Sequence, residues 1–384
     1  MSGAQNSKAD SSAAQWFPLR ITMRSQEGHC AGNRVESNRV AVCPETESKM
    51  NISRTDTILI TGATGLVGSH VAQQAREKGH RVVALCRRQA NTSSLTELGV
   101  EIISGDVNDT AAVKAATSEA TIVVHCAAKV GDWGATKDYR KVNVEGTRLL
   151  LDAALDSGNL MRWIQISSLG VYSGTDHYGT DETTAPSTKG IDGYTLTKVE
   201  SEQLVCDYAA DRQLPAVVLR PGFIYGPGDR TVMPRLIERL QAGKFAYLGN
   251  HDKLMNNTYV GNLCEAIWLA IHNDLAVREV FNIRDPRAVT KREFIETICD
   301  AAGFAKPTRV VPLHIAKPLA WIMEKTWKLL GKQTAPLVNR ARIKFLGRNL
   351  DFDIEKASLQ LGYDPQTDFR DAMPQTTKLV VRNA

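Results

Sequence analysis

The chain has 384 residues, a formal net charge of +5, and hydrophobic and charged fractions of 43% and 23%. This length and composition suit a soluble globular protein with one large α/β domain and a smaller companion. The basic residues are spread along the chain, which disfavours nucleic acid as a partner. Seven cysteines are scattered without metal-ligand spacing, so we expect neither a disulfide framework nor a metal site.

The first 49 residues are rich in Ser, Ala, Asn and Arg and show no periodic apolar pattern. They lack the apolar core of a secretory signal, and Asp10 and Glu27 are atypical of a transit peptide. We expect residues 1–54 to be a disordered extension, or Met50 to be the start of the functional protein. No apolar run of eighteen residues occurs, which predicts a cytoplasmic protein without a membrane-spanning helix.

After Arg54, short apolar strands alternate with amphipathic helices. This alternation predicts an α/β fold with a doubly wound parallel sheet, the Rossmann arrangement. The expected strands cover residues 57–60, 81–86, 100–103, 120–125, 162–167 and 216–220, and the clearest helices cover 66–78, 139–154 and 194–210.

Beyond Pro221 the alternation becomes irregular and the loops lengthen. We therefore expect a second unit that closes over the carboxyl edge of the sheet. The dinucleotide-binding domain takes residues 55–220 with about 257–284, and the smaller substrate-binding domain takes 221–256 and 285–384.

A glycine-rich turn joins the first strand to the first helix. Gly62 allows a tight turn, Gly65 lets backbone amides approach a pyrophosphate, and Gly68 lets the helix pack close to the strand. The helix N-terminus adds amide donors and the positive end of a dipole. This strand–turn–helix setting predicts a dinucleotide site. Its expected contacts are Gly62, Thr64, Gly65, Leu66, Val67 and Gly68.

The end of the second strand bears on the choice of cofactor. NAD-preferring enzymes usually place a carboxylate there to hold the ribose hydroxyls, whereas this chain has Cys86 followed by Arg87 and Arg88. Two guanidiniums can pair with a 2′-phosphate. We therefore expect NADP(H) in preference to NAD(H), with a solvated loop as the alternative explanation for the two arginines.

Tyr194 and Lys198 lie one turn apart on the same face of an expected helix. A free tyrosine has a pKa of about 10, and a nearby ammonium lowers that pKa by stabilising the phenolate. Tyr194 can then exchange a proton with a substrate hydroxyl while a hydride moves at the carbon. The preceding strand ends in Ser167 and Ser168, and a serine there can hydrogen-bond the same oxygen.

In their order along the chain, these motifs resemble those of the extended short-chain dehydrogenases, from residue 56 to about 290. The resemblance implies an NAD(P)-dependent enzyme that acts on CH–OH groups of a small molecule. It selects Ser168 over Ser167 as the catalytic serine and gives Asn143 either a catalytic or a helix-kink role. It also implies a homodimer formed through the helices that carry Asn143 and Tyr194. The further cofactor contacts that it implies are Asp106, Val107, Ala127, Ala128, Tyr194, Lys198 and Pro221.

Two stretches separate the branches of this family. Sugar-nucleotide members tend to have an asparagine after the sixth-strand arginine and a pair of aspartates further on. At residues 220–229 and 258–262 this chain instead resembles the 3β-hydroxysteroid and sterol dehydrogenases, in which Tyr-Val-Gly-Asn is usual. The resemblance implies a 3β-hydroxysteroid- or sterol-like substrate. A sugar-nucleotide epimerase or dehydratase, a dihydroflavonol-type ketone reductase and a nucleotide-binding protein without catalysis stay open.

Residues 312–332 mix apolar side chains, two of them tryptophan, with four lysines. A basic amphipathic helix of this kind can rest at a membrane surface and admit a lipid-soluble substrate. A helix that packs on its own domain shows a similar pattern. Peripheral membrane contact through residues 312–332 is therefore one of two expectations for this segment.

Overall fold

The computed structural model describes residues 53, 56–189 and 192–382. All of them belong to one compact unit of the chain. Apart from Ser53, the expected N-terminal extension falls outside the described residues, and so does Met50. Within the described part, no helix is long and apolar enough to cross a membrane.

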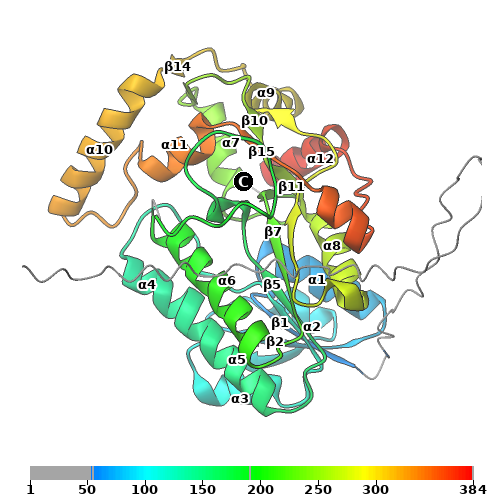
Figure 1. The fold of residues 1–384 in the computed structure, drawn as a ribbon. Coiled ribbons are helices and arrows are strands. Elements are labelled where there is room, and N and C mark those ends of the chain that lie inside the picture. The colour runs from blue at the N-terminus through cyan, green and yellow to red at the C-terminus, as the bar shows by residue number, and fades with distance from the viewer. Residues whose placement is uncertain (1–52, 54–55, 190–191, 383–384) are drawn as a thin grey trace, which may run out of the picture. The chain divides into compact units, whose positions relative to one another are not determined.

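A seven-stranded sheet occupies the lower part of the view in Figure 1. Its order is β12-β7-β5-β4-β1-β2-β3, and all neighbouring strands run parallel. This order confirms the predicted doubly wound α/β fold. The strands are β1 Thr57–Thr61, β2 Arg81–Cys86, β3 Glu101–Ser104, β4 Ile122–His125, β5 Arg162–Ile166, β7 Ala216–Pro221 and β12 Val280–Ile283.

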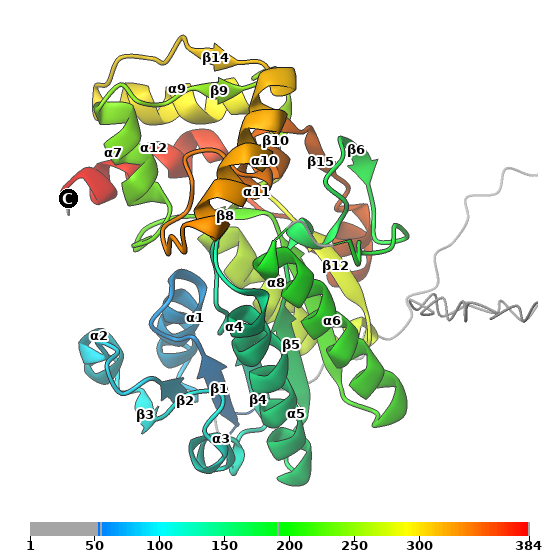
Figure 2. The same ribbon diagram turned by 90° about the vertical axis from the view of Figure 1, so that its left-hand side faces the viewer.

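Alternate side chains of the central strands enter two apolar cores. Ile58 and Ile60 of β1 face one core and Leu59 faces the other. Helices cover both faces (Figure 2), as a parallel sheet requires. The first core is closed by α1 Leu66–Glu77 and α8 Val260–His272, and the second by α3 Thr110–Thr117, α5 Gly146–Asp156 and α6 Gly193–Asp211.

The helix expected over residues 139–154 is interrupted. The chain forms α4 Thr136–Arg140, then a π-helical turn η1 Lys141–Glu145, and then α5. Asn143 lies in the middle of that turn and is buried. Such turns occur frequently at functional sites, and Asn143 is therefore placed at an irregular point of the helix.

The remaining elements form a second layer beyond the carboxyl ends of the strands (Figures 1 and 2). A third apolar core joins α7 Met233–Gln241, α9 Lys291–Ala302 and α12 Phe369–Arg382. A smaller cluster joins α10 Leu313–Leu329 to α11 Arg340–Gly347. The other elements of this layer are β6 His177–Thr180, β8 Phe223–Tyr225, β9 Tyr247–Leu248, β10 Leu254–Met255, β11 Asn257–Tyr259, β13 Val289–Thr290, β14 Val310–Val311 and β15 Leu350–Phe352. The short helix α2 Ser93–Glu97 instead lies beside the sheet, near β2 and β3 (Figure 2).

The carboxylate of Asp285, just after β12, ties this second layer to the sheet. It accepts hydrogen bonds from the Tyr225 hydroxyl at 2.9 Å and the Asn257 amide at 2.6 Å. It also accepts from the Asn262 amide at 2.8 Å and the backbone N–H of Tyr259 at 2.6 Å. Burial raises the pKa of Asp285, and the four donors oppose that shift. The Tyr-Val-Gly-Asn stretch therefore has a structural role in this fold.

Candidate active site

At two of its glycines, the turn between β1 and α1 has no room for a side chain. Gly62 has a φ of +69°, and a Cβ there would lie 2.8 Å from the backbone nitrogen of Ala127. A Cβ on the buried Gly68 would lie 2.8 Å from the Cα of Ala63. At the exposed Gly65 a Cβ would meet the carbonyl oxygen of Gly62 at 3.2 Å. The fold therefore requires Gly62 and Gly68 but tolerates a side chain at Gly65.

The N-terminus of α1 opens onto this turn. Gly65 is the N-cap, and among the described residues no side chain caps the helix. The first backbone N–H groups of a helix have no partner inside it, and together with the helix dipole they attract phosphate. Thr64, Leu66 and Val67 belong to the same segment. The residues present thus fit the pyrophosphate of a dinucleotide.

Strand β4, the neighbour of β1 in the sheet, brings further predicted residues beside the glycine turn. The backbone N–H of Ala127 donates to Thr61 Oγ1 at 3.2 Å, so Ala127 and Ala128 follow β4 next to Gly62. β3 and β7 stand on opposite sides of β1 in the sheet. The remaining predicted contacts lie at their carboxyl ends, with Asp106 and Val107 after β3 and Pro221 at the end of β7.

Arg87 and Arg88 follow β2 and are both exposed. Neither guanidinium forms an ion pair with a described residue. Arg81, at the other end of β2, does form ion pairs. Arg81 pairs with Glu101 at 2.8 Å and also with Glu119. Arg87 and Arg88 are thus exposed cations without an ion pair among the described residues.

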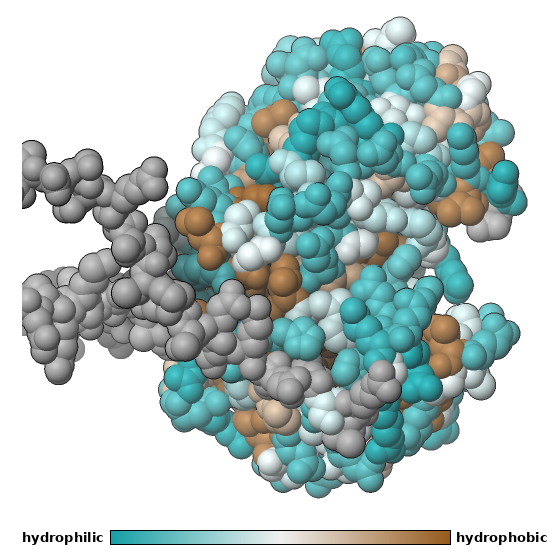
Figure 3. All heavy atoms as spheres, turned by 90° about the vertical axis from the view of Figure 1, so that its right-hand side faces the viewer, coloured by the Kyte–Doolittle hydropathy of each residue, from teal (hydrophilic) through white to brown (hydrophobic). Residues whose placement is uncertain are grey.

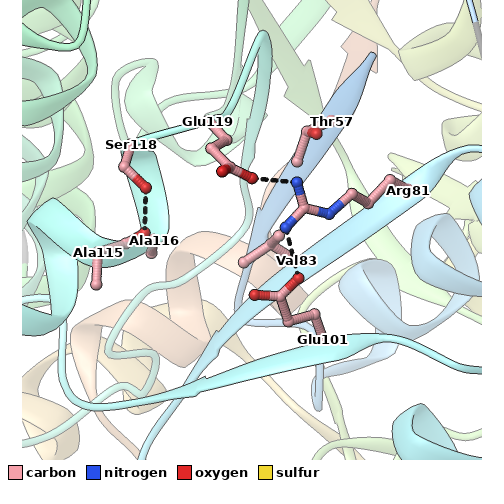
Figure 4. A pocket seen from close by; sticks show the side chains of 8 residues that line it. All are labelled: Thr57, Arg81, Val83, Glu101, Ala115, Ala116, Ser118 and Glu119. Carbon is pink, nitrogen blue, oxygen red and sulfur yellow. Dashed lines mark hydrogen bonds and ion pairs between the residues drawn. The ribbon is translucent and has the colours of Figure 1, made fainter. Parts of the chain in front are cut away.

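Arg81 lies in a pocket of about 140 Å³ at the amino ends of β1, β2 and β3 (Figure 4). That edge of the sheet is opposite to the glycine turn, and ligands of open α/β sheets bind at the carboxyl ends of the strands. None of the residues predicted for the site lines this pocket. Its cation is already neutralised, so this pocket is not the candidate active site.

Ser168 follows the carboxyl end of β5, and its side chain is near enough to Tyr194 of α6 to lower the pKa of that tyrosine. Lys198 lies one turn further along α6, and its Nζ donates to the carbonyl oxygen of Ile166 at 2.6 Å. The structure thus brings the three predicted residues to the same strand end. We call residues 167–172 the serine loop.

Burial governs the pKa values of this set. It raises the pKa of Tyr194 to about 12, against a lowering by the hydrogen bond with Ser168. It lowers the pKa of Lys198 to about 8. The expected lowering of the Tyr194 pKa is wrong for the protein alone, because burial outweighs the stabilisation of the phenolate. Tyr194 is therefore protonated at neutral pH.

Asn143 connects the helix that carries Tyr194 with the loop after β4. Its Nδ2 donates to Thr197 Oγ1 at 3.0 Å and to the carbonyl oxygen of Lys129 at 3.1 Å. Its Oδ1 accepts from the backbone N–H of Lys129 at 2.7 Å. Since Thr197 stands between Tyr194 and Lys198 in the chain, these bonds fix the start of α6.

A lysine that the sequence pattern does not single out also holds the serine loop. Lys344 of α11 donates from Nζ to the carbonyl oxygens of Gly170 at 2.6 Å and Tyr172 at 2.7 Å. Burial lowers its pKa to about 8, whereas the charge of Asp192 raises it. Lys344 has no motif around it, so no local signal identifies it.

A buried ion pair contacts the serine loop as well. Glu202 is one turn beyond Lys198 on α6, and it pairs with Arg220 of β7 where both are almost fully buried. Glu202 also accepts a hydrogen bond of 2.5 Å from Ser167 Oγ. Arg220 donates to the Tyr172 hydroxyl at 2.7 Å. The four-residue spacing from Lys198 is the sequence signal that identifies Glu202.

The same helix α11 reaches the loop after β4. Arg342 pairs with Asp132 at 2.6 Å between Nε and Oδ2. Just before α11, the carbonyl oxygen of Lys332 accepts from Trp133 Nε1 at 2.9 Å. Segments that follow β4 and β5 are thus both attached to the second layer.

A family model decides the identity of this fold and site. The model of the NAD dependent epimerase/dehydratase family matches residues 58–283. The chain belongs to this family. It is accordingly an NAD-dependent enzyme that acts on a hydroxyl or keto group, as its motifs predict.

Characterised relatives from the epimerase/dehydratase family cover most of the chain. The 2-alkyl-3-oxoalkanoate reductase of Shewanella oneidensis is 28% identical over 326 residues, which cover 82% of this chain and 84% of that protein. The 3beta-hydroxysteroid-dehydrogenase/decarboxylase isoform 2 of Arabidopsis thaliana is 31% identical over 291 residues, or 72% of this chain. The matched part is 51% of that relative, about half its length.

A solved structure confirms the family fold. UDP-glucuronic acid 4-epimerase from Bacillus cereus, in complex with NAD, has a TM-score of 0.67 at 22% identity. The match covers 85% of this chain and 99% of the epimerase. This chain therefore shares its fold with that epimerase, and the substrate must be argued from the site.

Proposed function

We propose that this enzyme transfers a hydride at a secondary alcohol or ketone of a 3β-hydroxysteroid- or sterol-like substrate. The observation that carries the proposal is the convergence of Ser168, Tyr194 and Lys198 at the carboxyl end of β5, at the sheet edge that holds the glycine turn. Relatives named for oxidation or reduction of such groups support it.

Each residue of the set has a chemical task in this reaction. A bound nicotinamide cofactor would supply or accept the hydride. Tyr194 is protonated at neutral pH and donates its proton to the ketone oxygen, or accepts one in the reverse direction. Ser168 hydrogen-bonds the same substrate oxygen. Lys198 holds the nicotinamide ribose and favours the phenolate, while Asn143 positions α6.

We further propose NADP(H) as the preferred cofactor, held by the predicted contacts around the glycine turn. The exposed guanidiniums of Arg87 and Arg88 support this preference, because each can pair with a 2′-phosphate. Arg87→Asp should weaken NADPH binding far more than NADH binding. Equal effects on the two cofactors would remove the basis for the preference.

The proposal includes the architecture around the site. Residues 55–220 with 257–284 bind the dinucleotide, and residues 221–256 with 285–384 bind the substrate. A sterol-like substrate resides in lipid, so we propose peripheral contact with a membrane as its route to the site. A homodimer formed through the helical segments that carry Asn143 (α4, η1 and α5) and Tyr194 (α6) stays a prediction.

Two other reactions use the same residues. A sugar-nucleotide epimerase would return the hydride and keep its cofactor bound, and a dihydroflavonol-type reductase would reduce a different ketone. The first assay follows reduced nicotinamide with NADP⁺ or NAD⁺ against 3β-hydroxysteroids, 4-carboxysterols, dihydroflavonols and sugar nucleotides. Turnover of a sterol supports the proposal. The epimerase is favoured instead if no sterol is turned over and if denaturation of the protein releases a bound nucleotide.

A variant tests the mechanism in the same assay. Tyr194→Phe should abolish turnover and leave the affinity for NADPH nearly unchanged, because the lost hydroxyl acts on the substrate. Wild-type turnover in this variant would refute the assignment of Tyr194.

A further inference from the structure

Helix α10 packs on the protein through a narrow stripe. Its buried residues are Ala316, Ala320 and Glu324, which recur every four positions and share one side of the helix. The Glu324 carboxylate is neutralised by Arg340, whose Nε lies 2.8 Å away. Most of the α10 surface therefore points away from the rest of the described chain, at the periphery of the second layer (Figures 1 and 2).

The outward side of α10 is apolar. Ile315, Leu319, Ile322 and Leu329 follow one another at intervals of four, three and seven residues, which places them on one face. They are 50%, 40%, 54% and 87% exposed, and Trp321 beside them is 57% exposed. We call these five residues the α10 face. Their exposure leaves these apolar side chains at the surface, with Thr326 as the polar residue on the same side between Ile322 and Leu329.

Positive charge borders the α10 face. The Lys325 ammonium lies 5.8 Å from the ring centre of Trp321. Within residues 313–332 the single acidic side chain is Glu324, which is already paired with Arg340. The charged groups that border the α10 face are thus all of one sign. The exposed lysines of this segment are Lys317, Lys325, Lys328 and Lys332.

We propose that the α10 face docks on an anionic lipid surface. The apolar side chains enter the interface and the lysines contact the headgroups, which is the arrangement of interfacial amphipathic helices. This proposal rests on the proposed function, since a sterol-like substrate partitions into such a surface. It names the surface through which the substrate reaches the enzyme.

The segments that follow α10 in the chain connect it with the site. The chain leaves α10 through Lys332, which contacts Trp133, and enters α11, whose Lys344 holds the serine loop. Lipid bound at α10 is therefore a short chain segment away from the catalytic set. The face shown in Figure 3 is different, because its uncovered part is mostly hydrophilic with apolar side chains in small groups.

Vesicle flotation with the full chain tests the proposal. Wild-type protein should float with vesicles of phosphatidylcholine plus phosphatidylserine, bind pure phosphatidylcholine weakly, and dissociate as salt is added. Leu319→Ser with Ile322→Ser, and Lys325→Glu with Lys328→Glu, should each weaken binding by about tenfold or more. Leu359→Ser serves as the control, since that leucine is 77% exposed outside α10.

Each result decides between distinct explanations. Equal binding of all variants, or none by the wild type, overturns the proposal. A dimer in gel filtration that the Leu319→Ser, Ile322→Ser variant dissociates would assign the α10 face to a second copy of the chain instead. Binding is measured without substrate, so vesicle association without sterol turnover refutes the proposed function and leaves the docking surface standing. An unchanged Tm in every variant excludes unfolding as the cause.

Discussion

The geometry of the glycine turn predicts different defects when Gly68 and Gly65 are each replaced by alanine. Gly68→Ala should lower the stability of the protein, whereas Gly65→Ala should weaken the binding of NADPH. At Gly68 the added Cβ would lie 2.8 Å from the Cα of Ala63 and nearer still to the carbonyl oxygen of Gly62. Both obstacles are backbone and the site is buried, so the helix must shift. Overpacking of this kind costs about 1–3 kcal/mol. At roughly 2–4 °C per kcal/mol, Gly68→Ala should lower the Tm by about 2–12 °C.

At Gly65 the expected result is the reverse. The added Cβ meets a single protein atom at 3.2 Å and otherwise projects outward from an exposed N-cap. Alanine in place of glycine at an N-cap costs up to about 1 kcal/mol, so the Tm should change little. Because the methyl group would occupy the space of the cofactor phosphates, the Kd for NADPH should rise at least tenfold, which is about 1.4 kcal/mol.

Differential scanning fluorimetry and a fluorescence titration with NADPH measure the two effects on the same samples. Ser69→Ala, in the first turn of α1, is the matched control because it adds no atom to the turn. The reasoning is refuted by a Gly65→Ala variant that binds NADPH as tightly as the wild type. It is equally refuted by a Gly68→Ala variant with an unchanged Tm.

Three further predictions concern charged groups around the serine loop. Lys344→Met removes two hydrogen bonds to carbonyls of this loop and should lower kcat about tenfold without changing the Kd for NADPH; an unaltered kcat contradicts this. Since the pKa of Lys198 is about 8, the ammonium is present below that pH and lost above it, so the Kd for NADPH should increase as pH rises through about 8. A pH-independent Kd in wild type, or the same rise in Lys198→Met, contradicts the assignment. Glu202→Leu leaves Arg220 buried without its carboxylate and should cost about 3–5 kcal/mol in urea unfolding, with partial recovery on adding Arg220→Met. No recovery in the double variant would argue against the ion pair as the cause.

The sequence predicts the parts of the site whose residues are neighbours in the chain. Gly62 and Gly68 are six residues apart, and the need for both arises within one strand–turn–helix unit. Tyr194 and Lys198 share a helix, so their spacing alone places them on one face. Six strands of the sheet lie within two residues of the expected ranges, because each is a compact apolar run.

Residues joined by the tertiary fold escape such reasoning. Lys344 is 174 residues from Gly170, whose carbonyl oxygen it contacts. No sequence pattern around Lys344 predicts that contact. The strand β12 was not expected, because Asn282 interrupts its apolar run. The structure explains that polar residue, since Asn282 Oδ1 accepts a hydrogen bond of 2.9 Å from the Tyr172 hydroxyl. The pKa of Tyr194 likewise depends on burial by distant segments.

The two attachments of α11 have a thermodynamic consequence. This helix is eight residues long, too short to bend, and it holds the loop after β4 through Arg342 and the serine loop through Lys344. A movement of α11 therefore loosens or tightens both loops at once, and the two ordering equilibria are linked. A ligand that favours one position of α11 gains affinity from the order of both loops. We therefore expect a substitution that breaks either attachment of α11 to affect the order of both loops.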